Sequence, residues 1–460
     1  MSFFGIGGSP RVPLYRGAGA RAPGYAAAMA EPHAGPRTAD AIRRNKKGPG
    51  DAIGDGTGDT TRAVAAAPRS ALRAQLPRLH LGRFPTPLER CPELAPASVE
   101  LWVLREDLAG SLGGNEAGDG AGDAGDETGP STSGAGGGRY GGNKLRKLEL
   151  VLAAPRLREG CEQGRPATLL TYGGYGSHHV LATALCAQPR GHRVAAILTP
   201  QPITEWSRKT LRALVHSGAT LLFARHLVEV PALVARARLR LPAPVVELPP
   251  GGSSPLGVLA WARGGREIAA QLTAQGCPRF DAVYVALGSG GMAAGLLLGL
   301  GEAAAELVAV RAVPWPLSSG ARVRWLAHRA RRFLQGAAHE LAQAAGDRPE
   351  HRLDLDLRAA LPVPRLRIDG SQVGPGYGAA TAAALEAVAR AAAAGLRLEP
   401  TYTGKTLAAL LADASSGRLT GKRVLLVHSA SSIDPPLGSP AEAAVPAWLR
   451  DRLQPDDEAP

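Results

Sequence analysis

The sequence has few cysteines and no cysteine pair of the kind that binds zinc. Its 460 residues include four cysteines, which lie far apart and form no C-x-x-C motif. This spacing argues against a structural zinc site, and four distant cysteines in so long a chain do not make a disulfide scaffold. No apolar run approaches the roughly 20 residues that span a bilayer, so no membrane partner is expected.

Aromatic residues are also scarce, at 4% of the chain, although hydrophobic residues reach 45%. The core must therefore be built from alanine, leucine and valine. The first 78 residues contribute +7 to a net charge of +13. Because their basic residues are scattered and have no aromatic residues between them, they are not typical of a nucleic-acid or membrane-surface arm. We expect no nucleic-acid partner.

Two segments have the composition of disordered chain. Residues 1–78 form a basic tail rich in glycine and proline, and residues 109–138 form an acidic, glycine-rich insertion. The folded remainder divides by pattern into a large domain (79–154 and 251–440), a small α/β domain (155–250) and a C-terminal tail (441–460). A cytoplasmic location is expected, and the N-terminal arginines leave an organellar transit peptide open as an alternative.

Strand-like and helix-like segments alternate after the insertion. Short apolar runs such as "ATLLTYGG", "VAAILTPQ", "DAVYVALGSGG" and "RVLLVHSASS" are separated by helical patterns such as "KLRKLELVLAAPRLREG", "SHHVLATALCAQ" and "MAAGLLLGLGEAAAE". This alternation predicts an α/β fold with parallel sheets flanked by helices. In such folds, functional groups gather at the carboxyl ends of the strands.

A glycine-rich turn follows one predicted strand, in "VALGSGGMAAG" from Val285 to Gly295. Glycines let backbone N–H groups approach an anion closely, and a helix N-terminus favours negative charge. The pattern therefore predicts a phosphate site. A dinucleotide fold would want an acidic residue about 20 positions later, where the next strand offers Arg311 and no acid. A nucleotide-binding protein is the weaker alternative.

A second turn of this type, "TYGGYGSHHVLATA", runs from Thr171 to Ala184. Ser177 and His178 fall at the expected helix start, where free N–H groups could hold a carboxylate. The simpler interpretation is an ordinary serine N-cap.

Lys144 stands in "GGNKLRKLEL", between a glycine pair and a predicted helix. A helix N-terminus disfavours a cation, and it lowers the pKa of an amine, which then becomes a nucleophile toward carbonyls. An amine of this kind, a phosphate site and a carboxylate site are together typical of pyridoxal phosphate chemistry on an amino acid.

Six motifs occur in the order found in one enzyme family. "YGGNKLRKLE", the serine–histidine turn, "GGSSPLG", "GSGGMAAG", "GPGYG" and "YTGK" resemble the 1-aminocyclopropane-1-carboxylate deaminase / D-cysteine desulfhydrase family. These are fold-type II pyridoxal phosphate enzymes, similar to the tryptophan synthase β chain. The resemblance covers roughly Arg83 to Asp434 without the acidic insertion, and it implies a two-domain fold and a homodimer.

The resemblance implies a role for each matching residue. Lys144 would bind the cofactor covalently and move the α-proton of a small amino-acid substrate, and Asn143 would support its loop. Ser177 and the N–H groups of His178 and His179 would receive the substrate carboxylate. Tyr377 and Tyr402 would flank cofactor and substrate, and Ser429 would face the pyridine nitrogen. The cofactor phosphate would be wrapped by Gly288, Ser289, Gly290, Gly291 and Ala293.

Two positions favour one branch of the family. At the second tyrosine, ring-opening deaminases carry a motif similar to "YEGK", whereas this chain has Thr403 in place of the glutamate. After the histidine of the last strand they carry an apolar residue, whereas this chain has Ser429. A neutral hydroxyl beside the pyridine nitrogen does not force its protonation. We therefore expect β-elimination from a small amino acid, with D-cysteine giving a 2-oxo acid, ammonia and sulfide. The alternative activity is 1-aminocyclopropane-1-carboxylate deamination.

Three departures from the family pattern bear on activity. His178 stands where the family has an asparagine that hydrogen-bonds the cofactor's phenolic oxygen, and an imidazole could donate instead. Met292 replaces a threonine that contacts phosphate, and Ala430 with Ser431 replaces a glycine pair. A catalytically degenerate homologue that still binds the cofactor therefore stays an alternative.

Overall fold

The computed structural model describes residues 72–110, 140–344, 352–357, 363–436 and 445–450. Most of the predicted tail 1–78 and the insertion from position 111 onward lie outside these residues. The prediction of disorder is wrong for Leu72–Pro77, which forms strand β1 and pairs antiparallel with β10 (Arg352–Leu357). Apolar residues alternate along "LRAQLP", a strand period that the composition of the surrounding tail obscures.

The larger sheet has six strands. All neighbouring pairs are parallel except β2 with β3. Strand β8, one of the two central strands, is buried at seven of its eight positions, as expected for a parallel strand covered on both faces. The strand order is β11 (Arg365–Asp369), β9 (Ala304–Arg311), β8 (Phe280–Leu287), β12 (Arg423–Val427), β3 (Glu100–Leu104) and β2 (Leu88–Arg90).

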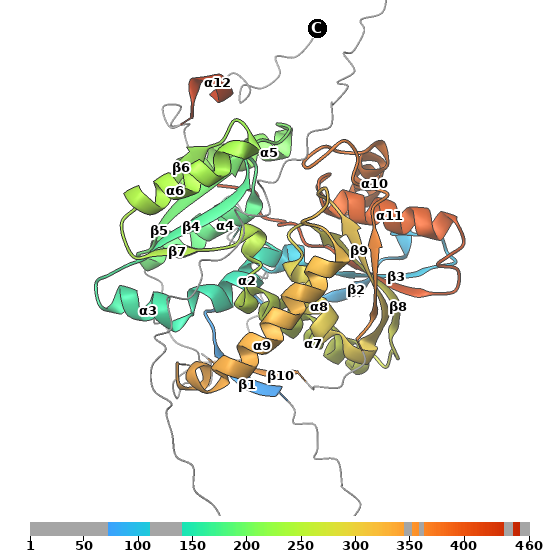
Figure 1. Ribbon diagram of the computed structural model, residues 1–460. Helices are drawn as coiled ribbons and strands as arrows, with labels where there is room; N and C mark the ends of the chain where they lie inside the picture. Colours follow the sequence, from blue (N-terminus) through green and yellow to red (C-terminus); the bar gives the residue numbers. More distant parts are fainter. Residues whose placement is uncertain (1–71, 111–139, 345–351, 358–362, 437–444, 451–460) are drawn as a thin grey trace, which may run out of the picture.

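Helices cover both faces of this sheet (Figure 1). Successive β8 side chains point to opposite faces: Val283 and Val285 join one core cluster, whereas Ala282 and Tyr284 join another. The first cluster includes residues of α7 (Pro255–Ala274), α8 (Gly291–Gly299) and α9 (Gly320–Ala344). The second includes residues of α10 (Ala382–Ala393) and α11 (Thr403–Ser415).

The smaller sheet has four strands, all parallel, and lies inside the range predicted for the small domain. One face packs on α6 (Val230–Arg240), and the other packs on α4 (His178–Ala187) and α5 (Glu205–His216). Trp448 and Leu449 of α12 (Ala447–Arg450) join the second face. The strand order is β6 (Thr220–Phe223), β5 (Arg193–Thr199), β4 (Thr168–Gly174) and β7 (Val245–Glu247).

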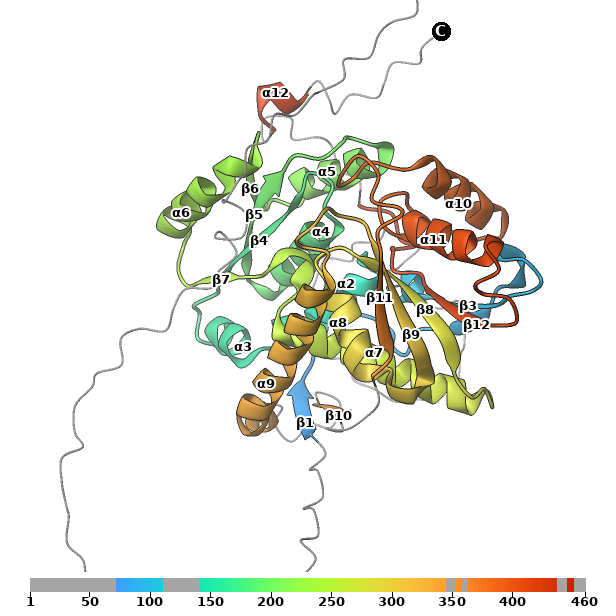
Figure 2. The ribbon, with the colours of Figure 1, turned by 45° about the vertical axis from the view of Figure 1, so that its right-hand side comes forward.

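Helix α2 (Asn143–Leu152) lies between the two sheets, as both ribbon views show (Figure 2). The helical pattern predicted behind Lys144 is interrupted after Leu152, and α3 (Pro155–Glu162) begins at a proline, which disfavours helix in the residue before it. None of the described helices combines the length and hydropathy needed to cross a bilayer.

The sequence pattern predicts a helix over 292–306, which is longer than the helix in the structure. Helix α8 ends at Gly299, Gly301 takes a left-handed φ of 56°, and β9 begins at Ala304. A residue in the left-handed region interrupts helical backbone, and glycine adopts it without strain. The predicted α/β class with parallel sheets flanked by helices is confirmed.

Candidate active site

A cavity of about 1060 Å³ is lined by residues from both sheets and from α2. The predicted site residues in its lining lie up to 286 positions apart, at the starts of α2, α4 and α8 and just after β12 among other segments. Ala293 is the exception among the predicted site residues, because it is buried in α8 within the core. The predicted residues that line the cavity are Asn143, Lys144, Ser177, His178, Gly288, Ser289, Gly290, Gly291, Tyr377, Tyr402 and Ser429.

Lys144 is held at the first turn of α2. The N-cap residue, Gly142, has a φ of 50° and offers no side-chain cap. A Cβ at Gly142 would lie 2.2 Å from the Ala430 carbonyl oxygen, so no other residue fits this approach. Lys144 Nζ donates to Asn143 Oδ1 at 2.7 Å. Burial lowers the pKa of Lys144 to about 8, which makes its neutral, nucleophilic form accessible near neutral pH.

The glycine turn between β8 and α8 leaves its helix without a side-chain cap. Its N-cap, Gly290, has a left-handed φ of 92°. The neighbouring Ser289 Oγ is 2.7 Å from Ser253 Oγ, which also accepts the Gly291 N–H at 3.2 Å. The guanidinium of Arg322 donates to the Ser289 carbonyl at 3.1 Å. Hydroxyls and main-chain N–H groups therefore converge at the positive end of α8, a setting that suits an anion.

The serine turn between β4 and α4 is built differently. Ser177 is the N-cap of α4, and its hydroxyl accepts the Val180 N–H at 3.4 Å. A Cβ at Gly173 would meet Ser177 Oγ at 2.3 Å, and one at Gly176 would meet Ser207 Cβ at 2.3 Å. Glycines therefore let the turn fold tightly against its neighbours. The simple N-cap role of Ser177 is present, and its hydroxyl also lines the cavity.

The two predicted tyrosines meet at the opposite wall. Tyr402 donates its hydroxyl to Tyr377 Oη at 3.2 Å, and burial raises the pKa of Tyr402. The carboxylate of Glu399 holds this wall by accepting the N–H groups of Thr401, Tyr402 and Thr403 at 2.7–2.9 Å. Thr403, one of the two residues from which the sequence predicts the reaction, is buried against Glu399 and does not line the cavity.

Three residues of charged type that line the cavity were missed from the sequence, namely Lys147, Arg225 and Glu399. Lys147 lines the cavity one turn after Lys144, and its Nζ donates to the Gly251 carbonyl at 2.7 Å. Burial lowers its pKa, and Lys144 lowers it further. The three-residue spacing of the two lysines places them on one face of α2, which is the signal that could have found Lys147. No sequence signal distinguished Glu399.

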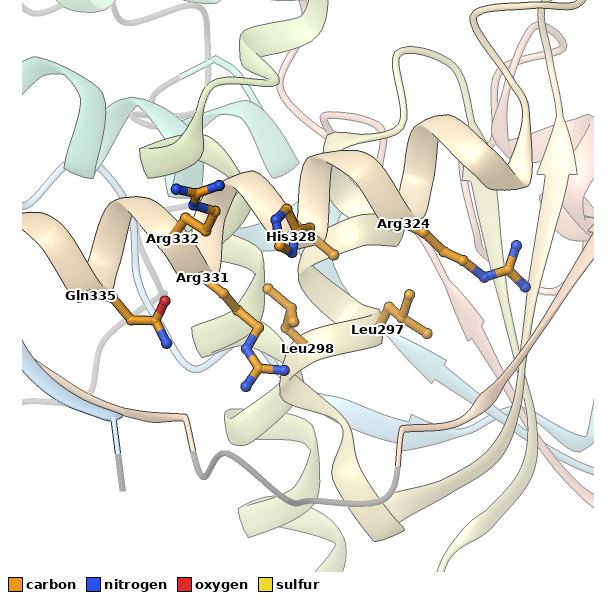
Figure 3. A pocket seen from close by; sticks show the side chains of 8 residues that line it. Leu297, Leu298, Arg324, His328, Arg331, Arg332 and Gln335 are labelled. Carbon is orange, nitrogen blue, oxygen red and sulfur yellow. The ribbon is translucent and has the colours of Figure 1, made fainter. Parts of the chain in front are cut away.

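A second hollow, of about 420 Å³, lies where α9 packs on α8 (Figure 3). It contains none of the predicted site residues. Its charged and polar side chains come from α9, and Leu297 and Leu298 of α8 form its floor. The described residues that line it come from the interiors of α8 and α9 and include no strand end or helix start, so they offer no convergent N–H groups like those of the larger cavity.

The larger cavity fits pyridoxal phosphate. Lys144 supplies an amine whose pKa is lowered by burial, and the uncapped start of α8 supplies a place for a phosphate. Both belong to one cavity, and the Nδ2 of Asn143 reaches Met292 Sδ in the first turn of α8 at 3.5 Å. The lysine and the anion site are therefore neighbours, as this cofactor requires.

Comparison with known proteins agrees with this fit. Residues 137–430 match the family model described as "Pyridoxal-phosphate dependent enzyme". The chain is 28% identical over 365 residues to a Pyrococcus abyssi protein provisionally named 1-aminocyclopropane-1-carboxylate deaminase, covering 78% of this chain and 93% of that one. It is 29% identical over 369 residues to D-cysteine desulfhydrase of Klebsiella pneumoniae, covering 77% and 94% respectively.

A solved structure shares the fold. The crystal structure of an ACC deaminase homologue superposes with a TM-score of 0.56 at 23% identity, over 82% of this chain and 95% of that one. The family match covers more than half of the chain and contains every predicted site residue. The chain therefore belongs to the pyridoxal-phosphate dependent enzyme family, in the fold-type II group with the 1-aminocyclopropane-1-carboxylate deaminases and D-cysteine desulfhydrases.

Proposed function

We propose that this protein is a pyridoxal phosphate-dependent lyase that eliminates sulfide from D-cysteine, releasing a 2-oxo acid and ammonia. The overall balance is D-cysteine plus water giving pyruvate, ammonia and hydrogen sulfide. No external oxidant or reductant is needed, because the carbon that loses sulfide gains a proton while the α-carbon becomes a carbonyl.

One observation carries the proposal. Lys144, whose pKa burial lowers to about 8, shares a single cavity with the uncapped start of α8 and the serine turn before α4. An amino acid needs a site for its carboxylate and a base for its α-proton, and the cofactor needs a site for its phosphate. The cavity offers a separate place for each of these three groups.

Each of the chain's own groups then has a defined task. When bound, the cofactor stabilises negative charge at the substrate α-carbon. Lys144 Nζ accepts the α-proton, because with its lowered pKa a substantial fraction of the amine is neutral near neutral pH. The Ser177 hydroxyl and the N–H groups at the start of α4 orient the carboxylate. The hydroxyl of Tyr402 keeps its proton because burial raises its pKa, and it donates to Tyr377 Oη, so the two tyrosines present neutral hydroxyls on one wall of the cavity.

Two features favour the desulfhydrase reaction over ring opening. Ser429 lines the cavity and presents a hydroxyl, which does not force protonation of a pyridine nitrogen. Thr403 stands at the position where, by the family resemblance, the ring-opening deaminases carry a glutamate. Expulsion of sulfide, a good leaving group, demands less electron withdrawal than opening of a carbon ring.

The test is product analysis of the purified, cofactor-loaded protein. D-cysteine, L-cysteine and 1-aminocyclopropane-1-carboxylate are offered separately, and sulfide, ammonia and 2-oxo acid are measured. We expect equimolar sulfide and 2-oxo acid from D-cysteine, no product from Lys144→Ala, and unchanged turnover in the matched surface control Lys209→Ala, whose amine pairs with Glu205 at 2.6 Å on α5.

Other outcomes would identify the alternatives. A four-carbon 2-oxo acid from the cyclopropane substrate, without sulfide from either cysteine, would assign the deaminase reaction. The protein could instead show the visible band of bound cofactor, lost in Lys144→Ala, and turn over none of the three substrates. It would then be a cofactor-binding homologue without lyase activity.

A further inference from the structure

Tyr140 is a buried residue that opens the motif "YGGNKLRKLE" but receives no role from the family resemblance. Its side chain is 3% exposed, and its hydroxyl is in hydrogen-bond contact with Nδ1 of His178. The two rings also stack, with centroids 5.9 Å apart and an interplanar angle of 15°. This contact ties the segment before α2 to the first residue of α4, and His178 lines the cavity.

The imidazole of His178 is neutral at physiological pH. Burial lowers its pKa to about 4, and the nearby Lys144 contributes to the shift. A neutral imidazole carries one N–H and one lone pair, so its two nitrogens have opposite hydrogen-bonding roles. Which nitrogen faces the ligand as a donor depends on the group bonded to the other.

The Tyr140 hydroxyl decides between these two tautomers. Burial raises the pKa of Tyr140, so the phenol keeps its proton. The other polar side chain beside it, Thr210, gives its own proton to the Trp206 carbonyl at 2.9 Å. An imidazole nitrogen is a stronger base than a threonine oxygen, so the phenol donates to His178 Nδ1. The remaining proton of the imidazole then resides on Nε2.

We propose that Tyr140 is a positioning residue that holds His178 in its Nε2–H tautomer, so that this N–H donates to an oxygen of the bound cofactor. Within the described part of the chain, Nε2 has no hydrogen-bond partner from the protein. An asparagine, which the family resemblance places at position 178, carries N–H donors in every state. A neutral histidine presents a donor at Nε2 in only one of its two tautomers. The hydrogen bond from Tyr140 would favour that tautomer.

The experiment measures the cofactor affinity of the protein and the state of His178. It rests on occupancy of the site by the cofactor and not on turnover, so it can fail while the proposed reaction stands. Tyr140→Phe keeps the stacked ring and removes the hydroxyl. We expect the cofactor Kd to rise about 10-fold and the visible absorption maximum of the bound cofactor to shift. Tyr284→Phe is the matched control, because Tyr284 is also a buried tyrosine but lies outside the cavity lining, and its hydroxyl donates to Asp413 Oδ2 at 2.5 Å.

A double-mutant cycle separates positioning from simple packing. Tyr140→Phe is combined with His178→Asn, which supplies an N–H that needs no tautomer control. We expect Tyr140→Phe to have little effect on the cofactor Kd in the His178→Asn background. An equal loss of affinity in both backgrounds would overturn the proposal, because it would mean that the Tyr140 hydroxyl only supports the fold.

The tautomer is read directly from nitrogen-15 spectra of the cofactor-loaded protein labelled at histidine, with His178 assigned by its absence in His178→Asn. We expect a protonated Nε2 and an unprotonated Nδ1, a mixed state in Tyr140→Phe, and no change in Thr210→Val. A protonated Nδ1 in the parent protein would overturn the proposal, and a tautomer change in Thr210→Val would show that the phenol donates to threonine instead.

Discussion

The turn after β4 and the turn after β8 both carry the chain from the end of a parallel strand into a helix that points at the cavity, but only the first is capped by the side chain of its own N-cap residue. Ser177 caps α4 by accepting the Val180 N–H, whereas α8 begins at Gly290 without a side-chain cap. A helix start needs partners for its N–H groups. At α8 the Gly291 N–H is accepted by Ser253 Oγ from a distant segment, and the N-cap residue itself supplies no side chain. The difference indicates that α4 is capped within its own turn, whereas the start of α8 is left more open to a ligand.

The largest effect should come from the uncapped turn. Gly290→Ala forces a left-handed conformation on a residue with a Cβ, at roughly 1–2 kcal/mol, and that Cβ would lie 3.1 Å from Leu326 Cδ1. If the turn relaxes, its N–H groups leave the positions that hold phosphate, and we expect the cofactor Kd to rise about 100-fold by fluorescence titration.

Gly276→Ala is the matched control for this prediction. Gly276 also has a left-handed φ, of 65°, but a Cβ there meets nothing within 4 Å and the residue does not line the cavity. It should lower stability without changing the cofactor Kd. Equal losses of affinity in both variants would remove the distinction between the two turns.

Lys144, which lies between the two turns, predicts a pH effect on the cofactor-free protein. Its pKa falls from 10.5 to about 8 on folding, so between these values the unfolded chain binds a proton that the folded chain does not. The free energy of unfolding should therefore rise with pH from about 8 to 10.5, by on the order of 3 kcal/mol in total. Urea titrations should show the rise, which Lys144→Met should reduce and Lys209→Met should leave in place; the part that persists in Lys144→Met comes from Lys147, whose pKa burial also lowers.

The capped turn should respond differently to loss of its serine. Ser177→Ala removes an N-cap, which costs about 1 kcal/mol of stability, and it removes a hydroxyl from the cavity, which should raise the substrate KM about 10-fold with little change in the cofactor Kd. Thr204→Ala removes the N-cap of α5 outside the cavity and should lower stability alone. If both variants leave KM unchanged, Ser177 acts as a cap and nothing more.

The smallest effect concerns Met292 in the first turn of α8. Met292→Thr adds a hydroxyl at the uncapped end, and one additional hydrogen bond should tighten the cofactor Kd about 3-fold. Met292→Leu loses the sulfur contact with Asn143 Nδ2 without adding a hydroxyl, so it isolates that contact. Weaker binding in both variants would show that the Asn143 contact outweighs a new hydroxyl.

The glycine-rich turns were predictable because their signal is local. Gly142 and Gly290 both adopt a positive φ, and glycine at the end of a strand pattern announces such a turn without knowledge of the rest of the chain. The parallel α/β class follows in the same way from alternating strand and helix patterns. The predicted roles of the site residues stay predictions, although eleven of the twelve line one cavity.

Other features could not be predicted, because they join distant segments. Thr403 was chosen from a motif, yet its side chain is buried against Glu399 and lies outside the cavity lining. Strand β1 was hidden in a tail of disordered composition and becomes a strand only through pairing with β10, which is about 280 residues away. The alternation in "LRAQLP" is a short local signal, but a local window does not contain the partner strand that stabilises it.

The sequence by itself determined which groups this protein can bring to chemistry, a lysine at a helix start and two helix starts with exposed N–H groups, because these depend on residues adjacent in the chain. Only the tertiary structure decided that they face one another and that Tyr140 meets His178 and Glu399 holds the tyrosine wall. The physical reason is that exclusion of water, which lowers the pKa of Lys144, requires two separate sheets to close around it.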